Sequence, residues 1–370
     1  MKIYYLVYAI LCFTALIAQY TSNDVKHRNK TICITGFLLI FFLLALRHRT
    51  MGIDLGYSSK TGKQGYLQSF QIISHFSWEK VLNMKAFLNY EKGYIIFNKL
   101  LGCISNSQQF LLIVCAFINI SVMAVYIYKK SKLPLLSWLV FLGLPVFLMM
   151  FSGLRQCIAI SITMLSLHWV ENKKPVRFIL TVLLANTFHS SAIIFLIAYP
   201  MYNIELSGWK QVVSIVIIPI IYVLRGPLFT VFSKIFKEEA DISETGAGTL
   251  FIIFFIIYVG LLIINNYNKT KPNKLLNLFY IACICQSFSG VYELALRVGY
   301  YFMIYLAIAL PNEVYNLKLK NGNTGQQEFI VGYMLVFAAF VVYGIYAIAT
   351  ATWAQTNPYH FFWETVNLSV

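Results

Sequence analysis

The sequence predicts an all-α, polytopic integral membrane protein with about ten to twelve transmembrane helices. The first observation is composition, because 59% of the 370 residues are hydrophobic and only 12% are charged. Soluble domains average about 45–50% and about 25% for these two classes. The second is a mean hydropathy of +0.69. The third is that the apolar residues gather in long runs between short basic segments. Together these observations exclude soluble, disordered and disulfide-scaffold proteins.

The apolar runs have the length that a bilayer requires, which is about 20 mostly apolar residues in a helix. We expect crossings in segments 3–20, 31–46, 109–128, 133–150, 154–170, 177–199, 209–224, 249–266, 275–290, 295–311 and 328–350. No soluble segment or repeat divides them. Residues 1–370 are therefore predicted to form a single polytopic membrane domain.

The positive charge predicts the orientation of the chain. There are 29 Lys and Arg against 14 Asp and Glu, a formal net charge of +15. In a soluble protein this excess favours a nucleic-acid partner, but membrane proteins collect basic residues in cytoplasmic loops, so no nucleic-acid partner is expected. The basic clusters lie at 26–30, 129–132, 173–177, 269–274 and 318–320. With these loops inside, the N-terminus is outside and 47–108 is an extracytoplasmic loop that carries an interfacial helix.

One stretch conflicts with this orientation. Three predicted spans lie between the basic clusters 173–177 and 269–274, although two cytoplasmic loops require an even number of crossings. We therefore expect a re-entrant or broken helix within 225–247, which contains Gly226 and Pro227. The total then becomes even, and the C-terminus lies outside.

The outer loop opens with two arginines and a glycine-flanked carboxylate. Arg47 and Arg49 follow the second predicted span, and Gly52, Asp54 and Tyr57 come next. Guanidinium groups present forked donors that suit phosphate or carboxylate, and glycine permits a tight turn. The alternative is a solvated loop whose arginines anchor a helix end.

Two further segments bring charge to the outer face. Glu91, between Tyr90 and Tyr94, belongs to segment 87–101, which predicts a turn followed by an amphipathic helix at the membrane interface. Arg155 and Gln156 begin a later span, where an arginine in low dielectric would hold an anionic group. The alternatives are interface anchoring and a snorkelling arginine.

Two later spans carry ionisable groups as well. His189 lies within the 177–199 span, where it is either a proton-transfer group or an interhelical hydrogen-bonding residue. Glu293 and Arg297 are four residues apart and share a helix face, with Tyr301 one turn on. They form either a self-contained salt bridge or a site for an anionic lipid-linked ligand.

Cofactor signals are missing from the sequence. It contains no nucleotide-binding glycine loop, zinc spacing or nucleophile elbow. We therefore expect no cofactor and no metal. The seven cysteines are scattered, most of them in apolar runs, and are interpreted as small apolar residues.

Together these segments resemble the EpsG branch of the Wzy-type bacterial polysaccharide polymerases. That family shows, in order, an Arg with Gly-x-Asp-x-x-Tyr, a Tyr-Glu-x-Gly-Tyr element, an Arg-Gln start to a middle span, a His-x-Ser-Ala element and a late Arg with Tyr-Phe one turn on. The matching residues are Arg47, Gly52, Asp54, Tyr57, Tyr90, Glu91, Gly93, Tyr94, Arg155, Gln156, His189, Ser191, Ala192, Arg297, Tyr301 and Phe302. Segment 358–363 resembles the family's aromatic tail.

The resemblance implies an enzyme that joins polyprenyl-diphosphate-linked oligosaccharide repeats into a capsule, exopolysaccharide or O-antigen chain. The lipid diphosphate would leave at the outer face of the bacterial cytoplasmic membrane. Arg155 and Arg297 would hold the diphosphate, His189 or Asp54 would act as the base, and aromatic residues would stack on sugars. The proposed aromatic contacts are Tyr57, Tyr94 and Trp363.

Substrate contacts are expected at the remaining matched positions and at the outer charged groups. These residues are Arg47, Arg49, Glu91, Gln156, Glu293 and Tyr301. A flippase or exporter of the same lipid-linked glycan, or another polyprenyl-phosphate-dependent glycosyltransferase such as an O-antigen ligase, is the alternative. The expected partners are the lipid-linked oligosaccharide, the bilayer, and a chain-length regulator and flippase of the same pathway.

Overall fold

The computed structural model describes residues 1–56, 64–84, 87–236, 248–268, 273–319 and 323–366. Over these ranges the chain is helical, and the only β pairings between described residues are two isolated bridges. The all-α prediction is therefore confirmed. Contacts divide the chain into two compact units, which are described in turn.

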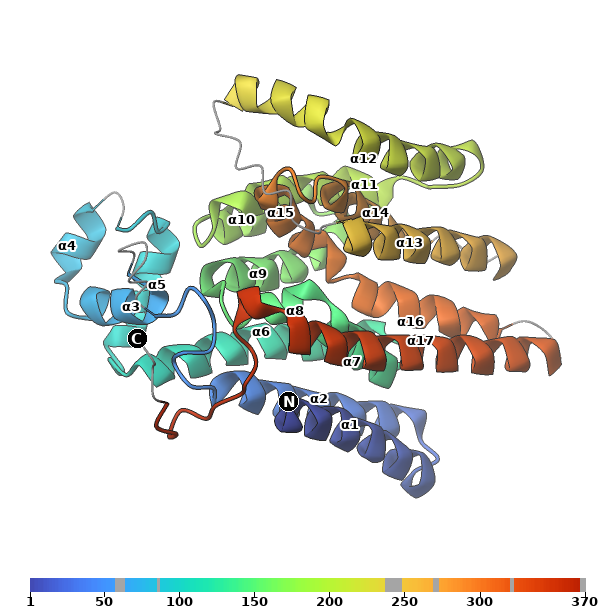
Figure 1. Ribbon diagram of the computed structural model, residues 1–370, viewed down its shortest axis with the longest axis horizontal. Helices are drawn as coiled ribbons and strands as arrows, with labels where there is room; N and C mark the ends of the chain where they lie inside the picture. The colour runs from blue at the N-terminus through green and yellow to red at the C-terminus, as the bar shows by residue number, and fades with distance from the viewer. Residues whose placement is uncertain (57–63, 85–86, 237–247, 269–272, 320–322, 367–370) are drawn as a thin grey trace. The chain divides into compact units, whose positions relative to one another are not determined.

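The first unit comprises Met1–Lys130, Pro134–Ile193 and Phe337–Val370. Its helices are α1 (Lys2–Thr21), α2 (Val25–Ala45), α3 (Tyr66–Ser74), α4 (Trp78–Asn83), α5 (Lys92–Gly102), α6 (Gln108–Lys130), α7 (Pro134–Gly143), α8 (Pro145–Met149), α9 (Leu154–Glu171) and α10 (Pro175–Asn186). The second half of α17 (Asn323–Thr350) and the 3₁₀ helix η2 (Thr352–Ala354) complete it. Helices α1 and α2 run side by side, and α6 lies against α2 (Figure 1).

Polar contacts fix the position of α9, which carries Arg155. Ser161 of α9 donates to Asn119 Oδ1 of α6 at 2.8 Å. At the other end of α9, Glu171 pairs with Lys130 of α6 at 2.6 Å. Between the spans, α3, α4 and α5 pack into a small group beside the start of α6, around buried side chains that include Phe70 and Ile95.

The second unit comprises Ser131–Leu133 and Ile194–Val336. Its helices are α11 (Ala198–Asn203), α12 (Trp209–Phe236), α13 (Gly248–Asn268), α14 (Lys274–Ser287), α15 (Glu293–Met303), α16 (Leu306–Leu317) and the first half of α17. The 3₁₀ helix η1 (Ser190–Ile197) joins the two units. Buried Glu313 of α16 accepts from Asn273 at 2.9 Å and from Asn265 at 3.5 Å, which ties α13, α14 and α16 together.

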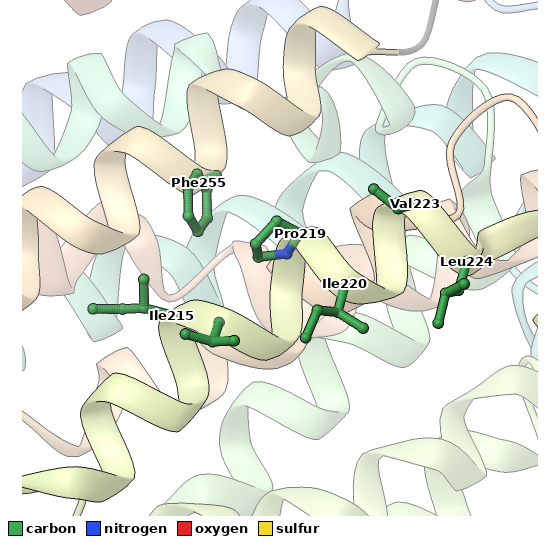
Figure 2. A pocket seen from close by; sticks show the side chains of 7 residues that line it. Ile215, Pro219, Ile220, Val223, Leu224 and Phe255 are labelled. Atoms are coloured by element: carbon green, nitrogen blue, oxygen red, sulfur yellow. The ribbon is translucent and has the colours of Figure 1, made fainter.

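An apolar groove of about 510 Å³ follows one face of α12. Its lining includes Ile215, Pro219 and Leu224, with Phe255 of α13 beside them (Figure 2). Every lining residue is apolar, which is the surface that a helix presents to lipid chains.

Six described helices are long and apolar enough to cross a membrane, namely α1, α2, α6, α12, α13 and α17. A seventh crossing is obtained if α15 and α16, which meet at a bend of 44°, form one span. Other predicted crossings fall on the shorter apolar helices α7, α10 and α14. The chain is a multi-pass membrane protein.

The break in the helices lies elsewhere than the sequence predicted. Helix α12 is continuous through Pro219 and Pro227 to Phe236, so a broken helix at 225–236 is wrong, and 237–247 lie outside the described residues. The predicted span 177–199 is instead divided, because α10 ends at Asn186 and η1 begins at Ser190. Residues before proline or at polar clusters commonly end helices, and the polar sequence at 186–191 does so here.

In the second unit, Asn277 near the start of α14 donates to the carbonyls of Met201 at 2.8 Å and Ile204 at 2.7 Å. The side of the membrane on which each loop lies stays a prediction.

The two chain ends lie together within the first unit. The Met1 ammonium donates to Asn357 Oδ1 at 3.1 Å, and Tyr4 donates to the carbonyl of Thr356 at 2.5 Å. The tail then pairs with the segment after α2, where His48 N–H donates to the His360 carbonyl at 2.8 Å. The number of crossings and the side on which the ends lie stay predictions.

Candidate active site

Three segments that are far apart in the sequence bring Glu91, Arg155 and His189 together. Glu91 precedes α5, Arg155 is the second residue of α9, and His189 follows α10. Arg155 Nη1 lies 2.5 Å from Glu91 Oε2, and His189 Nδ1 lies 3.4 Å from Glu91 Oε1. One carboxylate therefore contacts both of the residues that the sequence assigned to catalysis at these positions.

Glu91 is held in its ionised form. Burial raises the pKa of this carboxyl, but the His189 contact, the Arg155 charge and a hydrogen bond from Ser190 N–H outweigh it and lower the pKa to about 2. The Ser190 N–H donates to Oε1 at 2.8 Å. At neutral pH Glu91 is an anion that positions its neighbours and does not donate a proton.

Aromatic residues and backbone hold the Arg155 guanidinium in place. Nε donates to the Tyr66 hydroxyl at 3.2 Å, and Nη1 also donates to the Asn89 carbonyl at 3.1 Å. The Tyr90 ring centroid lies 4.6 Å from the guanidinium carbon, a cation–π contact. Nη2 makes no hydrogen bond to any residue that the structure describes. This nitrogen remains available to an anionic ligand.

His189 has the arrangement of a general base with an orienting carboxylate. Its side chain is 19% exposed, and its Nδ1 faces Glu91. A carboxylate beside Nδ1 favours the tautomer with the hydrogen on that atom, which leaves the Nε2 lone pair as the proton acceptor. At 3.4 Å the contact of Nδ1 with Glu91 Oε1 is electrostatic, and Nδ1 has no hydrogen-bond partner among the described residues.

Gly93 lets the Glu91 segment approach α10. A Cβ at Gly93 would lie 2.2 Å from Thr187 Oγ1 and 2.8 Å from the Thr187 carbonyl oxygen. The next residue, Tyr94, donates its N–H to that carbonyl at 3.3 Å. Only glycine fits this contact, which sets Glu91 beside His189.

The segment after α2 holds the turn that precedes Arg155. Gly52 has φ +120°, and a Cβ there would lie 2.0 Å from the Phe151 carbonyl oxygen. Ile53 N–H donates to Ser152 Oγ at 3.0 Å. The Asp54 carbonyl in turn accepts from Tyr66 N–H at 2.9 Å and so fixes the start of α3. The exposed carboxyl of Asp54 lies close enough to raise the pKa of Tyr66, although burial is the larger cause.

Arg47 lies in the interior, where it contacts backbone. It is 1% exposed, and it donates to the Leu44 carbonyl and, at 3.4 Å, to that of Met150. Its guanidinium carbon lies 5.4 Å from the Phe151 ring centroid. These contacts join the end of α2 to the turn before α9.

The other sequence-predicted residues fall in several environments. Tyr94 is fully buried, and its ring packs on those of Tyr66 and Tyr90, so it is part of the core and offers no face to a sugar. Gln156 is buried as well, whereas Arg49 is exposed. Trp363 is 60% exposed and stacks on Phe361.

Three of the predicted site residues, Glu293, Arg297 and Tyr301, belong to α15 in the second unit. Tyr301 is fully buried, Arg297 is partly buried, and the side chain of Glu293 lies outside the described residues. Tyr57 also lies outside them. Their roles, and that of Arg297 as a second diphosphate contact, stay predictions.

Tyr66 is the contact that sequence reasoning missed. Its hydroxyl holds Arg155 Nε, and its ring stacks on Tyr90 with centroids 5.5 Å apart. The available signal was an amphipathic stretch beginning at Tyr66, in a loop that the sequence placed at the outer face. As for metals, the part of the chain that is described holds no group of three or more His, Cys, Asp or Glu that could bind one.

The fold and the cluster together define a class of protein. It is a multi-pass α-helical membrane protein in which an interhelical loop and two helix ends form a charged cluster. The chain belongs to the EpsG family, whose model matches residues 30–361. The match includes Glu91, Arg155 and His189, and membership indicates a role of the polysaccharide-polymerase type. No curated protein and no solved structure matches the chain.

Proposed function

We propose that the protein polymerises polyprenyl-diphosphate-linked oligosaccharide repeat units at the outer face of the bacterial cytoplasmic membrane. The observation that carries the proposal is the bridge formed by Glu91 between His189 and Arg155. The bridge supports the proposal because it brings an imidazole and a guanidinium to one carboxylate. An imidazole can accept the proton of the attacking hydroxyl, and a guanidinium can stabilise the leaving diphosphate.

The proposed step forms one bond and breaks one. A hydroxyl oxygen of one repeat unit attacks the anomeric carbon of another, and the bond from that carbon to the diphosphate oxygen breaks. The electron pair leaves with the diphosphate, and the hydroxyl proton passes to His189 Nε2. The products are a longer saccharide on one lipid and free polyprenyl diphosphate.

Each residue of the cluster has one task in this step. His189 accepts the proton, with Glu91 keeping Nδ1 protonated and stabilising the imidazolium that forms. Arg155 directs Nη2 to the diphosphate as negative charge develops on the leaving oxygen. Tyr66, Tyr90 and Glu91 restrain Arg155, so little reorganisation is required during the reaction. Asp54, exposed beside α3, is the second candidate base.

The test uses purified protein in liposomes with the lipid-linked repeat unit as the only substrate. A polymerase uses this compound as both donor and acceptor, so a ladder of products on a gel supports the proposal. Transport of labelled substrate across the bilayer without elongation would instead identify a flippase. Elongation that occurs only after another acceptor is added would identify a ligase or related transferase.

Deletion of the gene gives the corresponding result in cells. We expect the chain-length ladder of the surface glycan to collapse to single repeat units. A normal ladder in a strain without a second copy of the gene would overturn the proposal.

A further inference from the structure

A polar cleft of about 620 Å³ lies in the first unit. Four segments line it: the chain after α2, helix α3, the start of α6 and the C-terminal tail. The residues used below are Arg49, Gln71, Gln108, Gln109, Phe362 and Glu364. None of the contacts made by Glu91, Arg155 or His189 involves them, so the cleft is separate from the reacting centre.

The backbone around the cleft is fixed by long-range contacts. Phe362 N–H donates to the Leu46 carbonyl at 2.9 Å, next to the His48–His360 hydrogen bond. Gln109 donates to the carbonyl of Ala45. The tail, the end of α2 and the start of α6 are therefore joined, and the cleft is formed before any ligand arrives.

The polar groups of the cleft include both donors and acceptors. Gln108 Nε2 donates to Gln71 Oε1 at 2.9 Å, which leaves Gln71 Nε2 and Gln108 Oε1 without a hydrogen-bond partner among the described residues. Glu364 adds a carboxylate, held by His360 Nδ1 at 3.1 Å. Arg49 is exposed and forms no ion pair with any described residue. Sugar hydroxyls, which donate and accept at once, require such a mixture.

The phenyl ring of Phe362 borders these polar groups. Phe362 is 44% exposed in the cleft wall. An aromatic face beside amides matches the apolar faces and hydroxyl edges of a saccharide. The volume lies within the range of small-molecule sites, about 300–1,000 Å³.

Helix α3 connects the cleft with the cluster. Tyr66 at its start holds Arg155, and Gln71 lies five residues further on, which is about 7.5 Å along a helix. A chain of a few sugars is long enough to extend from the reacting bond to the cleft.

We propose that this cleft binds a hydroxyl-rich oligosaccharide segment of the growing chain, a few sugar residues from the bond that forms. The proposal rests on the proposed polymerase function and adds a second saccharide site to it. Binding there keeps the product near Arg155 and His189 between additions, so the length of the polymer depends on the cleft while the joining of two repeats does not.

The experiment measures binding and chain length separately. The probe is a lipid-free fragment of two repeat units, released from the surface polysaccharide by mild acid and titrated into purified protein by calorimetry. Gln71→Ala and Phe362→Ala are the test variants. Gln68→Ala on the same helix and Trp78→Ala, an exposed aromatic residue on α4, are the matched controls.

We expect wild type and both controls to bind the fragment equally, and Gln71→Ala and Phe362→Ala to bind it at least tenfold more weakly. In the liposome assay the test variants should join two repeats at the wild-type rate but yield shorter chains. Melting temperatures equal to wild type establish that the variants fold, and exposed Gln71 provides a substitution that removes no buried contact.

Wild-type affinity and chain length in both test variants would overturn the proposal while leaving the polymerase function intact. A wild-type protein that neither elongates the lipid-linked substrate nor binds the fragment would overturn both. Loss of repeat joining in Gln71→Ala, with its fold retained, would place the cleft in the reacting centre and contradict a separate role.

Discussion

Arg47 and Arg155 were predicted as contacts for the same anionic substrate, but they lie in different surroundings. Arg47 is 1% exposed and donates to backbone carbonyls, and no carboxylate pairs with it among the residues described. Arg155 is 16% exposed at the side chain and pairs with Glu91. One arginine joins segments of the fold, and the other has a nitrogen left for a ligand.

This difference shows how the segment that carries Arg155 depends on the segment that carries Arg47. Arg47 and Gly52 both contact the backbone at 150–151, and that turn leads directly into Arg155. The early arginine motif therefore positions the later one. Substitutions at the two arginines should separate stability from chemistry.

The largest effect is expected at Arg155. Arg155→Ala should lower the rate of ladder formation by at least about 10³-fold, because it removes the cation that we propose stabilises the leaving diphosphate. Arg155→Lys should retain part of the rate, since it keeps the charge but loses the forked geometry. The measurement is the liposome assay at equal protein, with melting temperature as the control for folding. Full activity of Arg155→Ala would remove the assignment.

A smaller loss is expected at Glu91. Glu91→Gln keeps the size of the side chain but removes the charge that orients His189 and Arg155, and we expect a loss of about 10²-fold in rate. Activity equal to wild type would show that His189 needs no orienting carboxylate.

The same substitution changes the pH dependence of stability. The pKa of Glu91 is lowered from its usual 4.5 to about 2 in the folded protein, so its stabilising contribution is complete above about pH 5 and is lost as the pH falls through about 2. The difference in melting temperature between wild type and Glu91→Gln should stay constant from pH 8 to 5 and narrow below pH 4.5. A difference in melting temperature that does not narrow as the pH falls from 4.5 toward 2 would contradict the ionised state.

The smallest effect on catalysis is expected at Arg47. Arg47→Met removes charged hydrogen bonds to buried carbonyls, and we expect unfolding to become easier by about 2 kcal/mol. The folded fraction should retain a rate within about threefold of wild type. Thermal melting in detergent, followed by the liposome assay at a temperature below both transitions, separates the two quantities. A normal melting temperature with lost activity would give Arg47 a role at the substrate.

Much of the fold was readable from the sequence, because spans are encoded by local apolar runs and basic loops. Helices α1, α2, α6, α12, α13 and α17 each correspond to a predicted segment. The divided segment at 186–190 was missed because its two halves are too short to appear as separate crossings. Of the three helices in the outer loop, α3, α4 and α5, only α5 was predicted from the sequence.

The charged cluster was predicted residue by residue but not as a contact. Glu91, Arg155 and His189 are separated by 64 and 34 positions, and no local pattern states which of the outer charged groups meet. Tyr66 and Gly93 show the same limit, since their importance comes from contacts with Arg155 on α9 and Thr187 just after α10. Tertiary packing decides which arginine contacts buried backbone carbonyls and which pairs with a carboxylate.

The pairing of the tail with the chain after α2 has a consequence for biosynthesis. Residues 46–48 leave the ribosome early, whereas 360–362, their partners, leave only after α17. This pairing cannot form before residues 360–362 have been synthesised, so the wall of the polar cleft closes only after α17 has been made. A nascent or truncated chain that ends before Thr356 therefore has its helices but lacks this closure.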